Sequence, residues 1–419
     1  MPNPGTTENN EKTNALEEQK TPYLYMAMLM DMVGAPYEFR YRNIFTTDFE
    51  FLRDFNSNGR YVFTDDSVMT AATADILMSI EDAKGEKSDK EIVETGVRKY
   101  KKYVEDYPNG TFPGGYGGDF VKWAKKEGNE PMGINPITGY ASCGNGAGMR
   151  VSPVGWAYNT LEKTLHIADL TAQPSHSDPE GIKGAQAIAA AIYLARAGVN
   201  KDDIKSYLET KFDYDLDIDL ASYRHYHKVE LVEQTEVCPT TVPMAIRAFL
   251  EGDSYEDCGR KAISIGGDSD TIGAMTGGIA GAFYGMPKRL KEACEERLAA
   301  GKQKLLQSKE YKDREGEGKE KQEFILDVAK KFQSYIAERT TEPDMDEIDV
   351  ALARARVEEY ALNELRAVVK KQIEGVEDFR EIGDQDYAKM VVEKSPREDP
   401  DFLKLLAEME ATRLFFSCS

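Results

Sequence analysis

The sequence predicts a mainly α-helical protein. Apolar residues recur at helical spacing, two segments have the small-residue composition of closely packed helices, and period-2 runs of Val, Ile and Thr are few. The 419 residues are enough for two or three domains of ordinary size. Hydrophobic residues make up 41% of the chain, which is enough to build a core and argues against wholesale disorder.

The N-terminal part predicts a tail followed by two buried helices. Residues 1–20 are polar, without the apolar region of a signal peptide, and predict a disordered tail. Residues 23–33 are apolar on all sides and end at Gly34-Ala35-Pro36, which predicts a buried helix with a sharp stop. This run is too short to cross a membrane and contains Asp31, so we expect a soluble, cytoplasmic protein. Residues 67–80 predict the second buried helix.

Further helices are predicted up to residue 285. Their segments are either charged and amphipathic or rich in small residues, and they span 86–105, 184–198, 242–251, 256–265 and 272–285. A glycine-dense loop over residues 108–118 separates the first of them from the rest. The small residues of 272–285 favour a helix that lies close to its neighbours.

Composition changes after about residue 288, and this change predicts a domain boundary. Of the 119 residues from 301 to 419, 49 are charged, against 30% for the whole chain. We therefore expect a main domain over 21–290 and a charged, helical C-terminal extension over 291–419. Apolar side chains still recur at helical spacing in the extension, at Ile325, Val328, Ala329, Phe332 and Ile336 and again at Phe402, Leu405, Leu406, Met409, Phe415 and Phe416. We expect them to pack on the outer face of the main domain, with self-association as the alternative.

Charge and cysteine content exclude several kinds of protein. A net charge of −21 leaves no basic footprint for nucleic acid. The five cysteines form no CxxC pair, and there are only four histidines, so neither a zinc site nor a disulfide framework is indicated. If the protein binds a metal, oxygen ligands and a hard cation are expected.

Two acidic clusters each stand directly before an apolar helix. They are Thr64-Asp65-Asp66-Ser67 and Asp268-Ser269-Asp270-Thr271. Helix capping explains either cluster alone, because Asp, Ser and Thr satisfy the free N–H groups of a first turn. Capping needs one such residue, however, and each cluster supplies several oxygen side chains. Crowded carboxylates repel one another unless cations neutralise them, and oxygen ligands suit Mg²⁺ or Mn²⁺.

Several other features are candidates for chemistry, each with a structural alternative. Glu38 lies between two aromatic residues, where burial would raise its pKa and suit it to proton transfer; a surface glutamate is the alternative. The glycines of 142–150 can let a backbone approach a ligand, although glycine turns are common. For His176 a satisfied polar residue, and for Asp31 a structural hydrogen bond, is the simpler interpretation. The glycine loop at 114–118 is the weakest of these signals, and Asp119 after it is a poor candidate for an acid.

Taken together, the motifs resemble the ADP-ribosylglycohydrolase family, the group that includes the dinitrogenase-reductase-activating glycohydrolase. Five blocks match in order: 31–39 (DMVGAPYEF), 63–69 (FTDDSVM), 144–155 (GNGAGMRVSPVG), 175–185 (SHSDPEGIKGA) and 266–285 (GGDSDTIGAMTGGIAGAFYG). A sixth block, 242–250 (VPMAIRAFL), fits the family's helix before the last of these five. Met30 stands where the family usually has glycine, and Ser67 and Ser175 each replace a common threonine.

The resemblance implies a compact all-α fold with a two-metal cleft that holds two divalent cations, Mg²⁺ or Mn²⁺. It implies that six residues lie at the metals, with Asp270 bridging: Thr64, Asp65, Asp66, Asp268, Asp270 and Thr271. Glu38 matches the family's glutamate beside the metals and is the expected catalytic residue. The positions that match the lining of the ADP-ribose cleft are Asn145, Gly146, Ala147, Gly148 and His176.

The activity implied is metal-dependent hydrolysis of the bond between ADP-ribose and an acceptor, most simply an arginine side chain of an ADP-ribosylated protein. Hydrolysis of a free ADP-ribosyl metabolite or another nucleoside-type N-glycoside is the second hypothesis. A non-catalytic ADP-ribose-binding or structural member of the family is the third. Against the third, all the matched metal-side residues and Glu38 are present in this chain.

Overall fold

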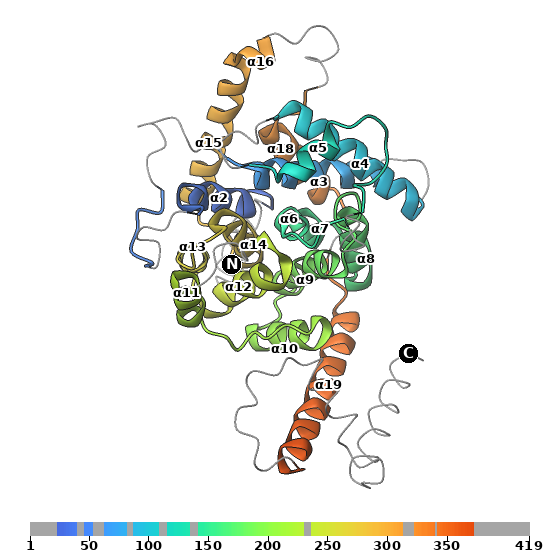
Figure 1. The fold of residues 1–419 in the computed structure, drawn as a ribbon, viewed down its shortest axis with the longest axis vertical. Helices are drawn as coiled ribbons and strands as arrows, with labels where there is room; N and C mark the ends of the chain where they lie inside the picture. Colours follow the sequence, from blue (N-terminus) through green and yellow to red (C-terminus); the bar gives the residue numbers. More distant parts are fainter. Residues whose placement is uncertain are drawn as a thin grey trace, which may run out of the picture.

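Helices make up nearly all the regular structure of the described residues (Figure 1). The computed structural model describes residues 23–39, 46–52, 63–81, 87–108, 115–134, 141–229, 236–312, 322–339 and 342–372. The one pairing of extended backbone within these ranges is an isolated antiparallel bridge between Gly144 and Val237. The prediction of an all-α fold is confirmed.

The helices of the first half are α2 (Tyr25–Gly34), the 3₁₀ turn η1 (Ala35–Tyr37), α3 (Asp65–Glu81), α4 (Asp89–Asp106), α5 (Gly118–Ala124), α6 (Gly146–Met149), α7 (Ser152–Ala157), α8 (Leu161–Ala172) and α9 (Pro179–Arg196). Those of the second half are α10 (Lys201–Phe212), α11 (Leu220–Val229), α12 (Cys238–Glu251), α13 (Tyr255–Ile263), α14 (Ser269–Tyr284), α15 (Lys288–Gln307), α16 (Lys309–Lys312), α18 (Ile325–Ala337) and α19 (Met345–Gln372). Each predicted helix up to residue 285 is present, and α15 lies almost wholly in the extension that was predicted to be helical. The helices that were not among the predictions are α5, α6, α7, α8, α10 and α11.

Helix α14 lies at the centre of the fold, where it packs against α2, α9, α12 and α13 (Figure 1). Its contact with α2 is the most extensive between any two described helices, and every residue of α2 is buried. Glycine makes this contact possible. A Cβ atom on Gly277 would lie 2.5 Å from the backbone oxygen of Met26, and one on Gly34 would lie 2.5 Å from that of Ser269. Neither distance is compatible with a side chain.

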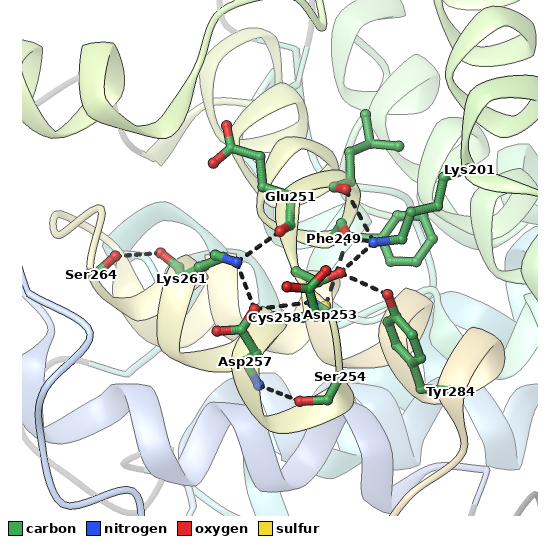
Figure 2. Close-up of polar contacts among 12 residues, drawn as sticks. Lys201, Phe249, Glu251, Asp253, Ser254, Asp257, Cys258, Lys261, Ser264 and Tyr284 are labelled. Atoms are coloured by element: carbon green, nitrogen blue, oxygen red, sulfur yellow. Dashed lines mark hydrogen bonds and ion pairs between the residues drawn. The ribbon is translucent and has the colours of Figure 1, made fainter.

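Two lysine side chains fix the C-terminal end of α12 (Figure 2). The Nζ of Lys201 donates to the carbonyl oxygens of Phe249, at 2.7 Å, and Leu250, at 3.1 Å. The Nζ of Lys261 donates to the carbonyl oxygen of Glu251 at 2.7 Å. These lysines satisfy carbonyl groups that have no partner within the helix, and their positive charge suits a helix C-terminus.

The described part of the C-terminal extension packs on the outside of the other helices. In α18 the predicted apolar stripe from Ile325 to Ile336 is buried, and this helix packs on α3. The first turns of α19 pack on α10, and the carboxylate of Glu347 accepts hydrogen bonds from the backbone N–H groups of Leu161 and Glu162 at the start of α8. The second predicted stripe, from Phe402 to Phe416, lies outside the described residues. Among the helices that are described, none has the length and apolar content needed to cross a membrane.

We expect Gly277→Ala to destabilise the protein by about 1–3 kcal/mol, because the new methyl group must push the backbone of α2 away. Gly278→Ala is the matched control. It lies on the same helix, but its Cβ would meet the end of the Ile192 side chain at 3.0 Å, which can move. Urea unfolding of the two variants measures the difference in free energy of unfolding. Equal stability of the two variants would contradict a backbone-limited contact between α2 and α14.

Candidate metal centre and cleft

Carboxylates from three parts of the chain meet where α14, α3 and the end of α2 come together. Oxygen atoms of Asp31, Asp66 and Asp270 all lie within 4.8 Å of one another, as do oxygen atoms of Glu38, Asp268 and Asp270. Each set offers three oxygen ligands to one hard cation. Asp270 is the only residue that belongs to both sets, and Asp65, although it lines the same cleft, belongs to neither.

Asp31 joins α2 to the first turn of α3. Its Oδ1 accepts a hydrogen bond from the Thr64 hydroxyl at 2.7 Å, and its Oδ2 accepts from the backbone N–H groups of Thr64 and Ser67, each at 3.1 Å. The Ser67 hydroxyl also donates to Oδ2. The structural partner predicted for this buried carboxylate is therefore present, and it caps α3 from outside that helix.

Further hydrogen bonds hold the remaining carboxylates but leave one oxygen unsatisfied. The Thr271 hydroxyl donates to Oδ2 of Asp66 at 3.3 Å, and the Asn145 amide donates to Oδ2 of Asp268 at 2.7 Å. Oδ1 of Asp66 is buried and has no hydrogen-bond partner within the described ranges. A buried carboxylate oxygen without a partner is costly, and a cation is the partner that suits it.

The carboxyl groups of the cluster are buried close to one another, and this raises their pKa values. Burial, and then the charges of Asp268 and Asp65, raise the pKa of Glu38 to about 8. Burial and the charge of Asp31 raise the pKa of Asp65 to about 7. Burial also holds the pKa values of Asp66 and Asp270 well above the ordinary range of a carboxyl. The negative neighbours that raise these pKa values would favour a divalent cation.

The cluster forms one wall of a cleft of about 360 Å³. Of the predicted ADP-ribose positions, Asn145, Gly146 and His176 line this cleft. Ala147 and Gly148 are buried in α6 instead, where a Cβ on Gly148 would lie 3.1 Å from the sulfur of Met275. The small size of these two residues therefore serves the packing of α6 against α9 and α14, and they do not line the cleft.

The structure adds lining residues that the sequence analysis did not single out, among them Tyr116, Arg150 and Glu236. Tyr116 belongs to the glycine loop, and its hydroxyl is buried without a hydrogen-bond partner among the described residues. Arg150 follows α6, and the backbone oxygen of Glu236 accepts from the N–H of Asn145 at 2.9 Å. No local pattern marks these three, because tertiary packing brings them to the cleft. Asp119 lies at the rim, exposed and paired with Lys122 at 2.8 Å.

Fold and site together define an all-helical protein with a cleft lined by crowded carboxylates. The chain belongs to the ADP-ribosylglycohydrolase family, whose model matches residues 23–315. The match thus ends in the C-terminal extension, past the boundary expected near residue 290. As a member of this family the protein is a glycosidase-type hydrolase of ADP-ribose linkages.

The chain is similar to named proteins and to a solved structure. The mouse protein ADP-ribosylhydrolase ARH3 is 29% identical over 286 residues, which cover 56% of this chain and 73% of the mouse protein. Its counterpart from cattle is 28% identical over 331 residues, or 64% of this chain and 86% of that protein. A solved structure titled "ADP-ribosylglycohydrolase-related protein complex" aligns with 67% of this chain and 93% of its own, at 22% identity and a TM-score of 0.46.

We expect the cation-free protein to lose stability as the pH rises from about 5 to about 8, by at least about 1 kcal/mol. The carboxyls of Glu38 and Asp65 keep their protons to higher pH in the folded chain than in the unfolded chain, so the folded state binds more protons in this range. Urea unfolding in EDTA measures the slope, and saturating Mg²⁺ should remove it. Stability in EDTA that rises with pH over this range would contradict the crowding of unneutralised carboxylates.

Proposed function

We propose that this protein uses two divalent cations, Mg²⁺ or Mn²⁺, to release ADP-ribose from a modified protein side chain, reversing mono-ADP-ribosylation. The observation that carries the proposal is the position of Asp270, which is shared by two sets of carboxylates. All members of the two sets except Asp31 line the cleft. A residue shared in this way is suited to bridge two cations. The buried Oδ1 of Asp66, which has no hydrogen-bond partner among the described residues, also supports a metal site here.

The residues present fit such a metal pair. Asp66 and Thr64 would hold the first cation from the α3 side, with Asp65 beside them. Asp268 and Thr271 would act from the α14 side, and Asp270 would bridge. When bound, the two cations would orient the vicinal ribose hydroxyls and polarise a water molecule.

Glu38 is the residue we assign to proton transfer. It lies half-buried at the mouth of the cluster, just after η1, and the N–H of Phe39 donates to the carbonyl oxygen of Gly267 at 2.8 Å. This hydrogen bond holds Glu38 against the α14 side of the site. In the cation-free protein, burial and acidic neighbours raise the pKa of this carboxyl to about 8. Its place beside the proposed metal pair suits it to move a proton during hydrolysis of a glycosidic bond.

Asn145, Gly146 and His176 are assigned to ADP-ribose. Asn145 has a second role, because its side-chain amide donates a hydrogen bond to the carboxylate of Asp268 at 2.7 Å. Gly146 leaves room on its wall of the cleft, where an added Cβ would lie 3.5 Å from Nε2 of His176. One wall thereby joins the sugar-binding positions to the metal-binding carboxylates.

The charge of the cleft favours arginine as the acceptor. Seven carboxylates line it: Glu38, Asp65, Asp66, Asp119, Glu236, Asp268 and Asp270. The charge of Asp119 is offset by its ion pair with Lys122. Two divalent cations and the guanidinium of Arg150 bring five positive charges, so the cleft stays negative even when both cations are bound. A guanidinium leaving group suits such a cleft. A free ADP-ribosyl metabolite is the alternative substrate, and a non-catalytic ADP-ribose-binding role is the third hypothesis.

We propose that residues 21–290 form the catalytic unit and that the extension from 291 stabilises it. The described helices α18 and α19 pack on α3, α8 and α10, and the residues that line the cleft all come from 38–271 among those described. Self-association through the part of the extension beyond residue 372 is the alternative role.

We expect Glu38→Gln to lower turnover by roughly 10²-fold or more while the protein stays folded and binds its cations. Asp119→Asn is the matched control, because this exposed carboxylate stands at the rim of the same cleft but pairs with Lys122. The assay measures ADP-ribose release from ADP-ribosyl-arginine, ADP-ribosyl-serine and a free ADP-ribosyl conjugate, with Mg²⁺ or with EDTA. Arginine should be the best acceptor, and EDTA should abolish release.

A fully active Glu38→Gln variant would remove Glu38 from the mechanism. Full activity in EDTA would contradict the metal dependence, and faster release from the serine or free conjugate would replace arginine as the acceptor. Absence of turnover with tight ADP-ribose binding would favour the non-catalytic hypothesis.

A further inference from the structure

A buried relay of three side chains ends at the wall of the cleft. Arg150, which follows α6, donates from its guanidinium to the hydroxyl oxygen of Ser175 at 2.8 Å. The Ser175 hydroxyl lies 2.8 Å from Nδ1 of His176. Ser175 is fully buried, and Arg150 and His176 are 2% and 6% exposed. The proposed function assigns His176 to ADP-ribose and uses Arg150 only for its charge.

The guanidinium is held in place without an acidic partner. It stacks over the ring of Tyr100, 4.0 Å from the ring centre, and also donates to the carbonyl oxygen of Thr171 at 3.4 Å. No carboxylate forms an ion pair with Arg150 in the described part of the chain. Its neighbours are a π face and neutral oxygen acceptors, so it remains a fixed donor with an uncompensated positive charge.

This arrangement fixes the direction of each hydrogen bond. A guanidinium can only donate, so the Ser175 oxygen accepts from Arg150. Among the described residues the serine proton then has one acceptor within reach, Nδ1 of His176. If Nδ1 carried a proton instead, it would also donate to the serine oxygen, and the buried serine proton would have no acceptor among the described residues. The satisfied arrangement leaves Nδ1 without a proton.

The other ring nitrogen of His176 faces the cleft. A Cβ on Gly146 would lie 3.5 Å from Nε2, and one on Gly144 would lie 3.6 Å from it, and all three residues line the cleft. Within the described residues Nε2 has no hydrogen-bond partner. Burial and the nearby positive charge of Arg150 hold the pKa of His176 well below its usual value, so the ring is neutral. A neutral ring with a bare Nδ1 carries its proton on Nε2.

We propose that Arg150 and Ser175 are positioning residues that hold His176 as a neutral hydrogen-bond donor, with its proton on Nε2 directed into the cleft. The donor would meet an acceptor oxygen of the substrate, in the ribose or the diphosphate. His176 is then neither a base nor a metal ligand, since both roles need a bare nitrogen facing the cleft. The substrate part of this inference rests on the proposed function, whereas the state of the ring does not.

The state of the ring is measured directly by ¹⁵N NMR of the full-length chain labelled at its four histidines, in Mg²⁺ at neutral pH. His176→Gln assigns the signal. We expect the wild-type ring to carry its proton on Nε2 alone. Ser175→Ala should give a mixture of the two neutral tautomers, and Ser175→Thr, which keeps the hydroxyl, should restore the wild-type signal. A wild-type ring with its proton on Nδ1, or with two protons, would overturn the proposal.

Binding of ADP-ribose, followed by calorimetry on the same proteins, tests the role of the donor. We expect Ser175→Ala to weaken binding by about tenfold, the size of one lost hydrogen bond, and Ser175→Thr to bind as the wild type does. Ser152→Ala is the matched control, because this serine is equally buried but its hydroxyl has no partner among the described residues. It should change neither the tautomer nor the affinity.

The outcomes separate this proposal from the proposed function. If Ser175→Ala changes the tautomer of His176 but keeps the affinity for ADP-ribose, the donor role of His176 is overturned. If Ser175→Ala leaves the tautomer unchanged, the relay through Ser175 is overturned. A wild-type chain with the expected tautomer that binds no ADP-ribose would support the relay and contradict the proposed function instead.

Discussion

The close approach of α2 and α14 is the contact on which the rest of the site depends. Gly277 and Gly34 let the two backbones meet at distances that leave no space for a Cβ atom. The approach places the first turn of α14, with Asp268 and Asp270, beside the end of α2, from which Asp31 reaches the first turn of α3. A larger separation would leave each acidic cluster as an ordinary helix cap. At the observed separation they become one site.

The same contact has an electrostatic cost, because it crowds carboxylates together. Glu38 and Asp270 have raised pKa values because burial and like charges act together, and the hydrogen bonds described for the cluster come from hydroxyls, an amide and backbone N–H groups. Hydrogen bonds of this kind orient carboxylates but do not cancel their charge. Bound cations would do both, and metal binding would then be coupled to the stability of this part of the fold. The positive charge of Arg150 lies near His176, to which Ser175 connects it, and it lowers the pKa of that ring.

The helical fold and the two acidic clusters could be predicted from the sequence because both are local. Helices such as α2 and α14 show their character within one segment, and the Asp-rich starts of α3 and α14 are visible as runs of adjacent residues. The family resemblance extended this to Glu38, Asn145 and His176, which all reach the cleft. The partner of Asp31 could not be predicted, because it lies 33 residues away on another helix.

Other parts of the site depend on tertiary structure in the same way. Arg150 and Tyr116 look like ordinary residues of a turn and a loop until packing brings them to the cleft. Ala147 and Gly148 share a motif with the lining residue Gly146, but the turn of α6 directs them into the core, which a motif cannot show.

Electron paramagnetic resonance of the protein titrated with Mn²⁺ tests whether α2 and α14 bring these carboxylates into a single two-metal site. We expect two Mn²⁺ per chain with the exchange-coupled spectrum of a bridged pair, and we expect Asp270→Asn to lose this spectrum. One ion per chain, or two ions with independent spectra, would contradict a single two-metal site.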